Sequence, residues 1–469
     1  MNILPVVSHV VDDFESIVAE LTETLADTGA ASVLRDSEAL TKYQRDMGAL
    51  EDPHLPLAVV LAESVSDVQN TLRWASTHRI SVVPRGAGTG VSGAAHAIER
   101  CIVLSLELMN RIIEVRPDDE IAVVEPGVVN ADLNAAVAQY GLMYAPDPAS
   151  YQQSTIGGNV STNAGGLRCA KYGVTRDSVL GLTVVMADGS IIETGKQTFK
   201  GVAGYDLTSL VIGSEGTLGI VVSATVRLRY LSKNQRAIAA IFPDIETAAQ
   251  GVLEIGRARI QPAILELLDD GVMAVIDSIH GTQLQGTGGA LLLALTDGFG
   301  ALLEEQAIRD QLSKLGATLF EPDDPQAMKL LEMRRVSRGD EQDDVYRVGE
   351  DVAVPRSKLV DYVHELRLIA ERHNVWVRTV AHAGDGNLHP TFWIDPAEGE
   401  AGLTRLERAL DDSIRSALAI GGTITGEHGV GQYKLRWLGW EQSEQVRELQ
   451  YKIKEVFDPQ GILNPGKAI

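Results

Sequence analysis

The sequence contains only two cysteines, Cys101 and Cys169, among its 469 residues. Two cysteines do not make a disulfide framework, and their scarcity is typical of a reducing compartment. Long apolar runs are also missing, because stretches such as Ala290–Leu295 are too short to span a bilayer. Residues 1–12 show neither a basic region nor an apolar core, so no signal peptide is expected. We therefore expect a cytoplasmic protein without an integral membrane segment, and peripheral contact with the inner face of the membrane stays open.

Positive charge is scarce as well. The chain has 41 Lys and Arg residues against 64 Asp and Glu residues, which gives a formal net charge of −23. This sign repels nucleic acid and anionic lipid, so both are poor partners. An anionic substrate would need local basic residues to overcome the general field. The length exceeds one ordinary core and predicts two or three domains.

Glycine, in contrast, is abundant and concentrated in loops. Pro84–Gly93 reads Pro-Arg-Gly-Ala-Gly-Thr-Gly-Val-Ser-Gly, and a second glycine-rich loop covers Ser154–Gly166. Glycine has no Cβ, so the backbone N–H groups of such loops approach an anion closely. Two loops that are also rich in Ser, Thr and Asn predict a long ligand with a pyrophosphate and a polar ring system. A flavin dinucleotide fits this description.

The first loop formally matches the dinucleotide fingerprint at Gly88, Gly90 and Gly93. A nicotinamide-binding Rossmann domain needs a helix that begins at this loop and faces the pyrophosphate. Residues 94–100 are too few for that helix, because 101–106 already reads as a strand. The sequence therefore argues against a nicotinamide site.

Hydrophobic patterns change character near residue 231. Before it they predict strands at 57–62, 81–83, 101–106, 121–124, 179–187, 190–193 and 220–230, with helices at 14–28, 66–78 (capped by Ser66) and 130–139 (capped by Asn130). Asp188-Gly189 predicts a hairpin turn. After residue 231 they predict strands at 237–242, 290–295 and 352–354, helices at 245–258, 300–315 and 358–373, and a solvated acidic loop at 340–344. We expect domains at 1–230 and 231–425, and a segment at 426–469 that packs back on the first domain.

Three motifs in order, Pro84–Gly93, 156–166 and 213–220, resemble the FAD domain of the vanillyl-alcohol oxidase and p-cresol methylhydroxylase superfamily. Over roughly residues 40–469 the chain is similar to its FAD-linked D-2-hydroxy-acid dehydrogenases. This branch contains the FAD subunit of glycolate oxidase, D-lactate dehydrogenase and D-2-hydroxyglutarate dehydrogenase. The resemblance implies an α+β fold with a two-part FAD-binding domain of the p-cresol methylhydroxylase type and an α+β substrate (cap) domain with an antiparallel sheet.

The resemblance also implies how FAD binds: the first loop holds the pyrophosphate and the second lies along the flavin. The first loop has no His, His96 reads as a surface or loop residue, and Cys169 lacks the context of a cysteinyl flavin, so we expect non-covalent FAD. The residues assigned to FAD are Pro84, Arg85, Gly86, Ala87, Gly88, Thr89, Gly90, Ser92, Gly93, Pro148, Ser154, Thr155, Gly157, Gly158, Asn159, Ser161, Thr162, Asn163, Gly165, Gly166, Tyr172, Glu215, Gly216, Gly219, Ile220 and Asn464.

A further cluster reads His382-Ala-Gly-Asp-Gly-Asn-Leu-His389. Strand-like sequence on both sides and the turn signal at 384–386 predict a hairpin with the two His on neighbouring strands. Gly426-Glu-His-Gly429 adds a carboxylate beside an imidazole. Two His and one Glu are a common ligand set for Zn²⁺ or a similar divalent ion. The alternative for such a His pair is a structural role in a core or a turn.

The resemblance implies that His382, His389 and Glu427 hold a divalent metal, with zinc as the expected ion, and that His428 is the base. Such an ion binds the carboxylate and hydroxyl of a 2-hydroxy acid and lowers the pKa of the hydroxyl. His428, titrating near neutrality, would take the hydroxyl proton while the C2 hydride passes to flavin N5.

Two residues are expected to contact the substrate. Arg334 matches the family's substrate arginine, although a solvated helix surface is the alternative, and Asn387 is the second. The hydroxyglutarate enzymes carry a Lys where this chain has Gly349 or Glu350, which weakens the case for a long dicarboxylate. Two other arginines, Arg347 and Arg356, could substitute for that Lys.

The sequence thus predicts an FAD-dependent dehydrogenase of small D-2-hydroxy acids, with D-lactate favoured over D-2-hydroxyglutarate and glycolate. An alcohol or phenol oxidase would not need the His, His and Glu set, and a non-catalytic subunit would show degraded site residues. No nicotinamide site is visible, so we expect an external electron acceptor: an electron-transfer flavoprotein, a cytochrome or a quinone. The sequence leaves open whether the protein forms a homodimer.

Overall fold

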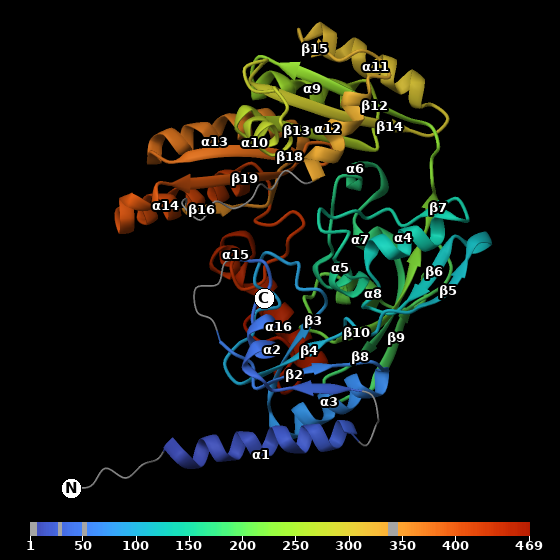
Figure 1. The fold of residues 1–469 in the computed structure, drawn as a ribbon, viewed down its shortest axis with the longest axis vertical. Helices are drawn as coiled ribbons and strands as arrows, with labels where there is room; N and C mark the ends of the chain where they lie inside the picture. Colours follow the sequence, from blue (N-terminus) through green and yellow to red (C-terminus); the bar gives the residue numbers. More distant parts are fainter. Residues whose placement is uncertain (1–6, 27–30, 49–53, 336–345) are drawn as a thin grey trace.

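The computed structural model describes residues 7–26, 31–48, 54–335 and 346–469, and the acidic stretch 340–344 lies outside these residues. Figure 1 shows two bodies: two sheets with their helices in the lower part and one large sheet in the upper part. The last helices, in red, lie against the lower body. No helix among the described residues has the length and apolar character that a membrane crossing requires.

The first sheet holds three parallel strands and one antiparallel edge strand, in the order β1-β2-β4-β3. Helix α3 crosses from β2 to β3, and its cap is Ser64 rather than Ser66, because Ser64 and Asp67 form a capping box. Residues 94–100 contain no helix, as expected. The elements are α1 Val7–Ala26, β1 Ser32–Leu34, α2 Ser37–Lys42, β2 Ala58–Leu61, α3 Val65–His78, β3 Ser81–Arg85 and β4 Cys101–Ser105.

The second sheet is antiparallel, in the order β5-β6-β10-β8-β9. Strands β8 and β9 pair across the turn at Asp188-Gly189, which confirms the predicted hairpin. The predicted strand 220–230 is two strands, because the chain leaves the sheet after Arg227 and β11 pairs with β7. The strands are β5 Ile112–Arg116, β6 Ile121–Val124, β7 Leu142–Met143, β8 Val179–Val185, β9 Ile191–Gly195, β10 Ile220–Arg227 and β11 Arg229–Tyr230.

Two further local predictions in this body were wrong. Asn130 does not cap its helix: its Nδ2 donates to the Pro146 carbonyl at 3.0 Å, and the capping position is Val129. The second glycine stretch is largely a helix, because Thr155 caps it and accepts from Gly158 N. The helices here are α4 Asn130–Ala138, α5 Ile156–Thr162, α6 Cys169–Tyr172, α7 Thr175–Ser178 and α8 Leu207–Val211, with the 3-10 turn Pro117–Asp119.

The upper body is one antiparallel sheet in the order β15-β12-β14-β13-β18-β19-β16, with β17 also paired to β19. Helices α9, α11, α13 and α14 share one core with one face of the sheet. Helices α10 and α12 pack on the other face. The strands are β12 Gln235–Phe242, β13 Ile264–Asp269, β14 Ala290–Asp297, β15 Thr318–Leu319, β16 Tyr346–Gly349, β17 Val352–Ala353, β18 Trp376–His382 and β19 Asn387–Ile394. The helices are α9 Ile245–Arg257, α10 Asp270–His280, α11 Ala301–Lys314, α12 Pro325–Arg335, α13 Leu359–His373 and α14 Gly399–Ala419, with 3-10 turns at Arg356–Lys358 and Pro396–Glu398.

The C-terminal segment, with α15 Leu435–Glu441 and α16 Glu444–Phe457, contacts the first glycine loop. Leu463 forms a parallel bridge with Val82 of β3. The Lys467 ammonium is buried and donates to the carbonyls of Gly93 and His96 at 2.7 and 2.8 Å. These contacts hold the end of the chain against the first loop. The domain boundaries at residues 230 and 425 stay predictions.

Candidate active site

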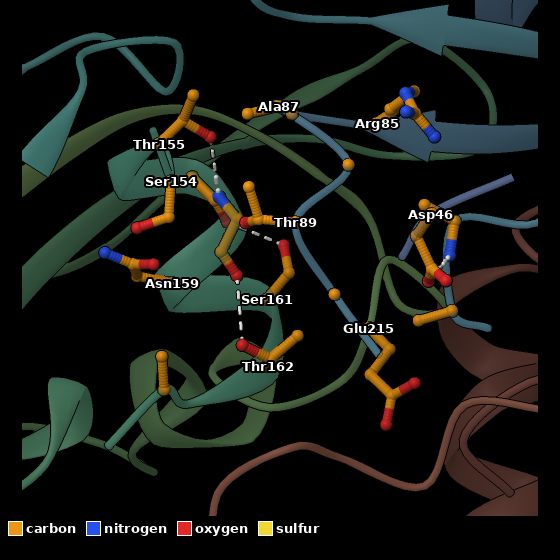
Figure 2. A pocket seen from close by; sticks show the side chains of 18 of the residues that line it. Asp46, Arg85, Ala87, Thr89, Ser154, Thr155, Asn159, Ser161, Thr162 and Glu215 are labelled. Atoms are coloured by element: carbon orange, nitrogen blue, oxygen red, sulfur yellow. Dashed lines mark hydrogen bonds between the residues drawn. The ribbon is translucent and has the colours of Figure 1, made fainter. Parts of the chain in front are cut away.

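The glycine motifs surround one large cavity with about 1190 Å³ of empty space, part of it open to solvent. The first loop forms one wall, α5 a second and the turn at Glu215 a third (Figure 2). Most of the residues predicted to bind FAD line it: Pro84, Arg85, Gly86, Ala87, Gly88, Thr89, Gly90, Pro148, Ser154, Thr155, Gly157, Gly158, Asn159, Ser161, Thr162, Gly165, Glu215, Gly216, Gly219 and Ile220.

Six predicted FAD contacts are not among the lining residues of this cavity, and their contact with FAD stays a prediction. The Ser92 hydroxyl donates to the His428 carbonyl at 2.8 Å, and the Tyr172 hydroxyl donates to Asp297 Oδ2 at 2.6 Å. Asn464 Nδ2 donates to the Glu215 carbonyl at 2.7 Å. The other three are Gly93, Asn163 and Gly166.

Sequence reasoning missed some lining residues, and most of these lie outside the glycine motifs. Asp46 is buried, and its Oδ1 lies 2.8 Å from His96 Nε2. His96 is therefore a buried loop residue paired with a carboxylate, not a surface residue. The remaining missed lining residues are Val91, Ala94, Ala95, Leu106, Pro126, Ala149, Ser150, Ala164 and Val221.

Two of the residues that line the cavity carry buried polar atoms. Ser154 Oγ and Asn159 Nδ2 are buried and have no hydrogen-bond partner among the described residues. An unpaired buried polar group costs free energy, so both atoms favour a bound partner with polar groups. Gly88 has a φ of 71°, a conformation that glycine adopts without strain. These features fit a flavin dinucleotide.

The two histidines lie on neighbouring strands, as predicted. Strands β18 and β19 pair as a hairpin, and the Nε2 atoms of His382 and His389 each lie 3.2 Å from Glu427 Oε1. The three ligand atoms lie within 4.8 Å of one another. Behind them, Glu266 Oε1 lies 2.7 Å from His382 Nδ1, which leaves Nε2 directed at Glu427. This donor set fits a divalent ion such as Zn²⁺.

The carboxylates of this group stabilise positive charge between them, and the imidazoles stabilise the ionised form of Glu427. Burial raises the pKa of Glu427, but His382 and His389 outweigh it and hold that pKa well below its usual range. Burial lowers the pKa of His382, and Glu266 with Glu427 raises it well above its ordinary value. The group therefore places one buried carboxylate, Glu266, and one half-buried carboxylate, Glu427, around one imidazole, an arrangement that a metal ion also stabilises.

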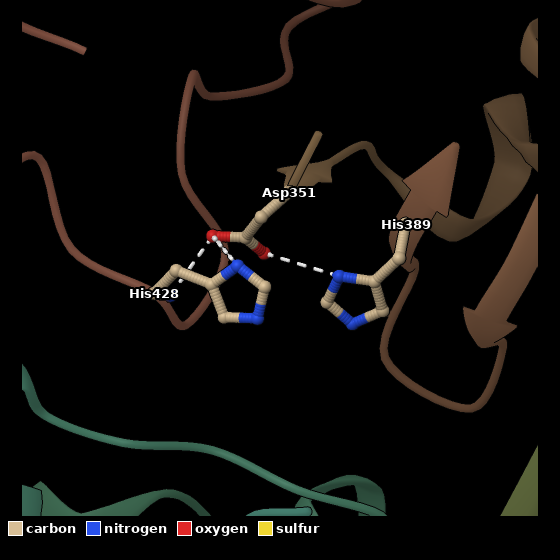
Figure 3. A group of neighbouring side chains, drawn as sticks. All are labelled: Asp351, His389 and His428. Carbon is tan, nitrogen blue, oxygen red and sulfur yellow. Dashed lines mark hydrogen bonds and ion pairs between the residues drawn. The ribbon is translucent and has the colours of Figure 1, made fainter. Parts of the chain in front are cut away.

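Asp351 is the functional residue that sequence reasoning missed most clearly. It is fully buried, and its carboxylate faces His389 and His428 at 3.9 Å from each Nδ1 (Figure 3). The same carboxylate accepts from the Thr425 hydroxyl and Lys434 Nζ, and from the backbone N–H groups of Gly426, Glu427 and His428. It thus fixes the segment that carries Glu427 and His428. An acidic residue after a short strand gave no separate signal in the sequence.

His428 lies between the cavity lined by the glycine motifs and the group of His382, His389 and Glu427. It lines the same cavity as the glycine motifs, next to Glu427. Burial lowers its pKa to about 4, although Asp351 opposes this shift, so the expectation of titration near neutrality was wrong. A neutral imidazole at pH 7 is the form that accepts a proton.

The two predicted substrate residues lie beside the metal-ligand candidates. Arg334 is buried, and its Nε lies 2.8 Å from Glu266 Oε2. Asn387 is buried, and its Oδ1 has no hydrogen-bond partner among the described residues. A Cβ on Gly426 would clash with this amide, so glycine permits the close approach of the two segments. Contact of either residue with a substrate stays a prediction.

Comparison with known proteins decides the family. The model for the C-terminal domain of FAD-linked oxidases matches residues 231–468, and an FAD-binding domain model matches residues 56–195. The chain belongs to the FAD-linked oxidase family. It is 38% identical to glycolate oxidase subunit GlcD of Bacillus subtilis, over 95% of this chain and 94% of the relative. It is 35% identical to a D-lactate dehydrogenase of Archaeoglobus fulgidus, over 88% of this chain and 91% of the relative.

Among solved structures, p-cresol methylhydroxylase with substrate bound superimposes with a TM-score of 0.78 at 18% identity, over 97% of both chains. This confirms the predicted two-part FAD-binding fold with antiparallel sheets. As an FAD-linked oxidase similar to GlcD and to D-lactate and D-2-hydroxyglutarate dehydrogenases, the chain is an oxidoreductase that acts on CH–OH groups of a small molecule.

Proposed function

We propose that this FAD-linked oxidase is a dehydrogenase of D-2-hydroxy acids that forms the 2-oxo acid with the help of a divalent metal. One observation supports this most strongly: Glu427 and His428 line the same cavity as the glycine motifs. A substrate held at the His382, His389 and Glu427 group would therefore lie within reach of both the base and the flavin. Arg334 and Asn387, next to that group, are the proposed substrate contacts.

The chain's own residues account for substrate orientation and proton removal. His428 accepts the hydroxyl proton at Nε2, because its Nδ1 faces the Asp351 carboxylate. Asp351 keeps this ring and Glu427 in place through its backbone hydrogen bonds. Bound FAD supplies N5 as the hydride acceptor, and the metal supplies positive charge for the carboxylate and hydroxyl of the substrate.

For the electron acceptor we propose only a chemical class, and the oligomeric state stays a prediction. An electron-transfer flavoprotein, a cytochrome or a quinone is the proposed acceptor. A homodimer and contact with the membrane surface remain predictions. Glycolate and D-2-hydroxyglutarate are the alternatives to D-lactate, since enzymes named for all three substrates are similar to the chain.

Anaerobic reduction of the bound flavin tests this proposal directly. The panel contains both enantiomers of lactate and of 2-hydroxyglutarate, together with glycolate. We expect bleaching of the flavin by D-enantiomers and none by L-enantiomers. Bleaching by L-enantiomers alone, or by no 2-hydroxy acid, would contradict the assignment.

We predict that the flavin is bound without a covalent bond. Cys169, the cysteine nearest the second glycine stretch, is buried, and burial holds its pKa well above the ordinary value, so the thiolate needed for attachment is scarce. Acid precipitation should release all yellow colour into the supernatant. Flavin fluorescence that stays with the denatured chain in gel electrophoresis would disprove the prediction.

We also predict dependence on a divalent metal. Dialysis against a chelator should abolish flavin reduction by substrate, and Zn²⁺ or Mn²⁺ should restore it, because the His and Glu donors hold the ion that orients the substrate. Photochemical reduction of the flavin serves as the control and should not change. Full activity in chelator-treated, metal-free protein would remove the metal from the proposal.

A further inference from the structure

Glu266 lies on β13, an inner strand of the upper sheet, behind the metal-ligand candidates. It is the direct cross-strand partner of His382 on β18, and such partners point to the same face of a sheet. Helix α12 packs on that face and carries Arg334 in its last turn. The strand register and the helix therefore bring three charged or polar side chains together from three separate elements.

Each carboxylate oxygen of Glu266 has its own partner. Oε1 lies 2.7 Å from Nδ1 of His382, and Oε2 lies 2.8 Å from Nε of Arg334. The side chain of Glu266 has no exposed area, while those of His382 and Arg334 are 7% and 8% exposed. Fully paired polar groups that are shielded from water hold one another in a single geometry.

The two partners have different roles in the proposed function. A carboxylate only accepts hydrogen bonds, so Nδ1 of His382 carries the proton and Nε2 keeps the lone pair that binds a metal ion. The other oxygen of the same carboxylate holds the guanidinium of Arg334, the proposed contact of the substrate carboxylate. Glu266 is itself shielded from solvent, so it acts on metal and substrate only through these two neighbours.

We propose that Glu266 is a positioning residue that sets metal affinity through His382 and substrate affinity through Arg334. This inference rests on the proposed function. An amide of the same size cannot keep both contacts. If the oxygen of a Gln faced His382, its NH2 group would oppose the donors of Arg334. If the amide were turned round, its NH2 group would donate to Nδ1, and the ring proton would move to Nε2 and block metal binding.

The test measures Zn²⁺ affinity and kinetics in Glu266→Gln. Calorimetric titration of Zn²⁺ into metal-free, FAD-loaded protein should show binding weakened roughly 10- to 100-fold, the range for loss of a group that orients a metal-ligating histidine. At saturating Zn²⁺, the KM for the best substrate should rise about 10-fold or more, because Arg334 is displaced. The value of kcat should fall less than KM rises, since weaker ground-state binding acts on KM.

The matched control is Glu305→Gln, which removes another buried carboxylate. Its Oε1 lies 2.9 Å from Nε of Arg309 on α11, a helix that packs on the opposite face of the sheet. This variant should keep the wild-type Zn²⁺ affinity and KM. Equal losses in Glu305→Gln and Glu266→Gln would overturn the positioning role, because any broken buried ion pair would then have the same effect.

A second variant covers the case in which Glu266→Gln does not fold. Glu266→Asp keeps the charge and both acceptor oxygens, but its side chain is shorter by one methylene group. It should bind Zn²⁺ less tightly than the wild-type protein and more tightly than Glu266→Gln. If only Glu266→Asp folds, weakened Zn²⁺ binding supports the inference, and wild-type affinity overturns it.

Wild-type Zn²⁺ affinity or a wild-type KM in Glu266→Gln would overturn the inference. Absence of Zn²⁺ binding in the wild-type protein would also overturn it, whereas flavin reduction by a D-2-hydroxy acid would leave the dehydrogenase assignment standing. If no 2-hydroxy acid reduces the flavin, the proposed function fails, and the Zn²⁺ titration alone decides the role of Glu266. Weakened binding in Glu266→Gln then supports that role, and unchanged binding overturns it.

Discussion

Replacement of His428 by Ala should lower the rate of flavin reduction by substrate roughly 10²- to 10⁴-fold, the range for loss of a general base. His428 lines the cavity with its pKa lowered to about 4, so its neutral ring accepts the hydroxyl proton at neutral pH. The FAD content should not change, because the glycine motifs that surround the flavin cavity are intact. Stopped-flow absorbance under anaerobic conditions measures the rate.

The control for this variant is His364→Ala, which removes an exposed histidine of α13. It should reduce its flavin at the wild-type rate. Wild-type bleaching by His428→Ala would remove this residue from the proton transfer. Loss of FAD in that variant would instead show that the ring supports the cofactor site.

Replacement of Asp351 by Asn should destabilise the protein by about 3–5 kcal/mol, the cost of breaking a buried ion pair. The Lys434 ammonium is buried and would lose its only ion-pair partner among the described residues. The Gly426–His428 segment would lose the carboxylate that accepts its N–H groups. Misplacement of Glu427 and His428 by about 1 Å is enough for a 10²-fold loss of kcat. Thermal unfolding measures the loss of stability, and steady-state kinetics measures the loss of kcat. The metal content of the variant shows whether Glu427 still helps to hold the ion.

A double variant separates the charge from the hydrogen bonds. Asp351→Asn with Lys434→Met leaves no unpaired buried ammonium, so it should be more stable than Asp351→Asn alone. Its kcat should stay low, since the hydrogen bonds to the charged carboxylate are still missing. Wild-type stability and metal content in the single variant would contradict the role given to Asp351.

Sequence reasoning succeeded where a local pattern fixes local geometry. The hairpin between His382 and His389 follows from two strand-like segments and a glycine turn, and the structure contains it. The glycine motifs converge on one cavity because the parallel strand pair that ends at the first loop and helix α5 lie on either side of it. Family resemblance, not spacing, linked Glu427 to these histidines across the chain.

The errors and omissions come from contacts between distant segments. Asp351 reads as one acidic residue among 64 acidic residues, and only the fold brings it under the Gly426–His428 backbone. His96 is buried and paired with Asp46, and no local sequence pattern predicts a pairing between residues this far apart in the chain. The side-chain periodicity of β16 and β18 is visible in the sequence, but the register in which both strands pair with β19 is not.

The central claim is that three separate segments bring His382, His389 and Glu427 together on a dication beside the flavin. A crystal structure of the protein with FAD, with anomalous data at the zinc absorption edge, measures this directly. We predict an anomalous peak bonded to both imidazoles and to the glutamate, facing the isoalloxazine ring. An FAD-bound structure of active enzyme with no peak at these residues, or with the ring in another cavity, would contradict the account.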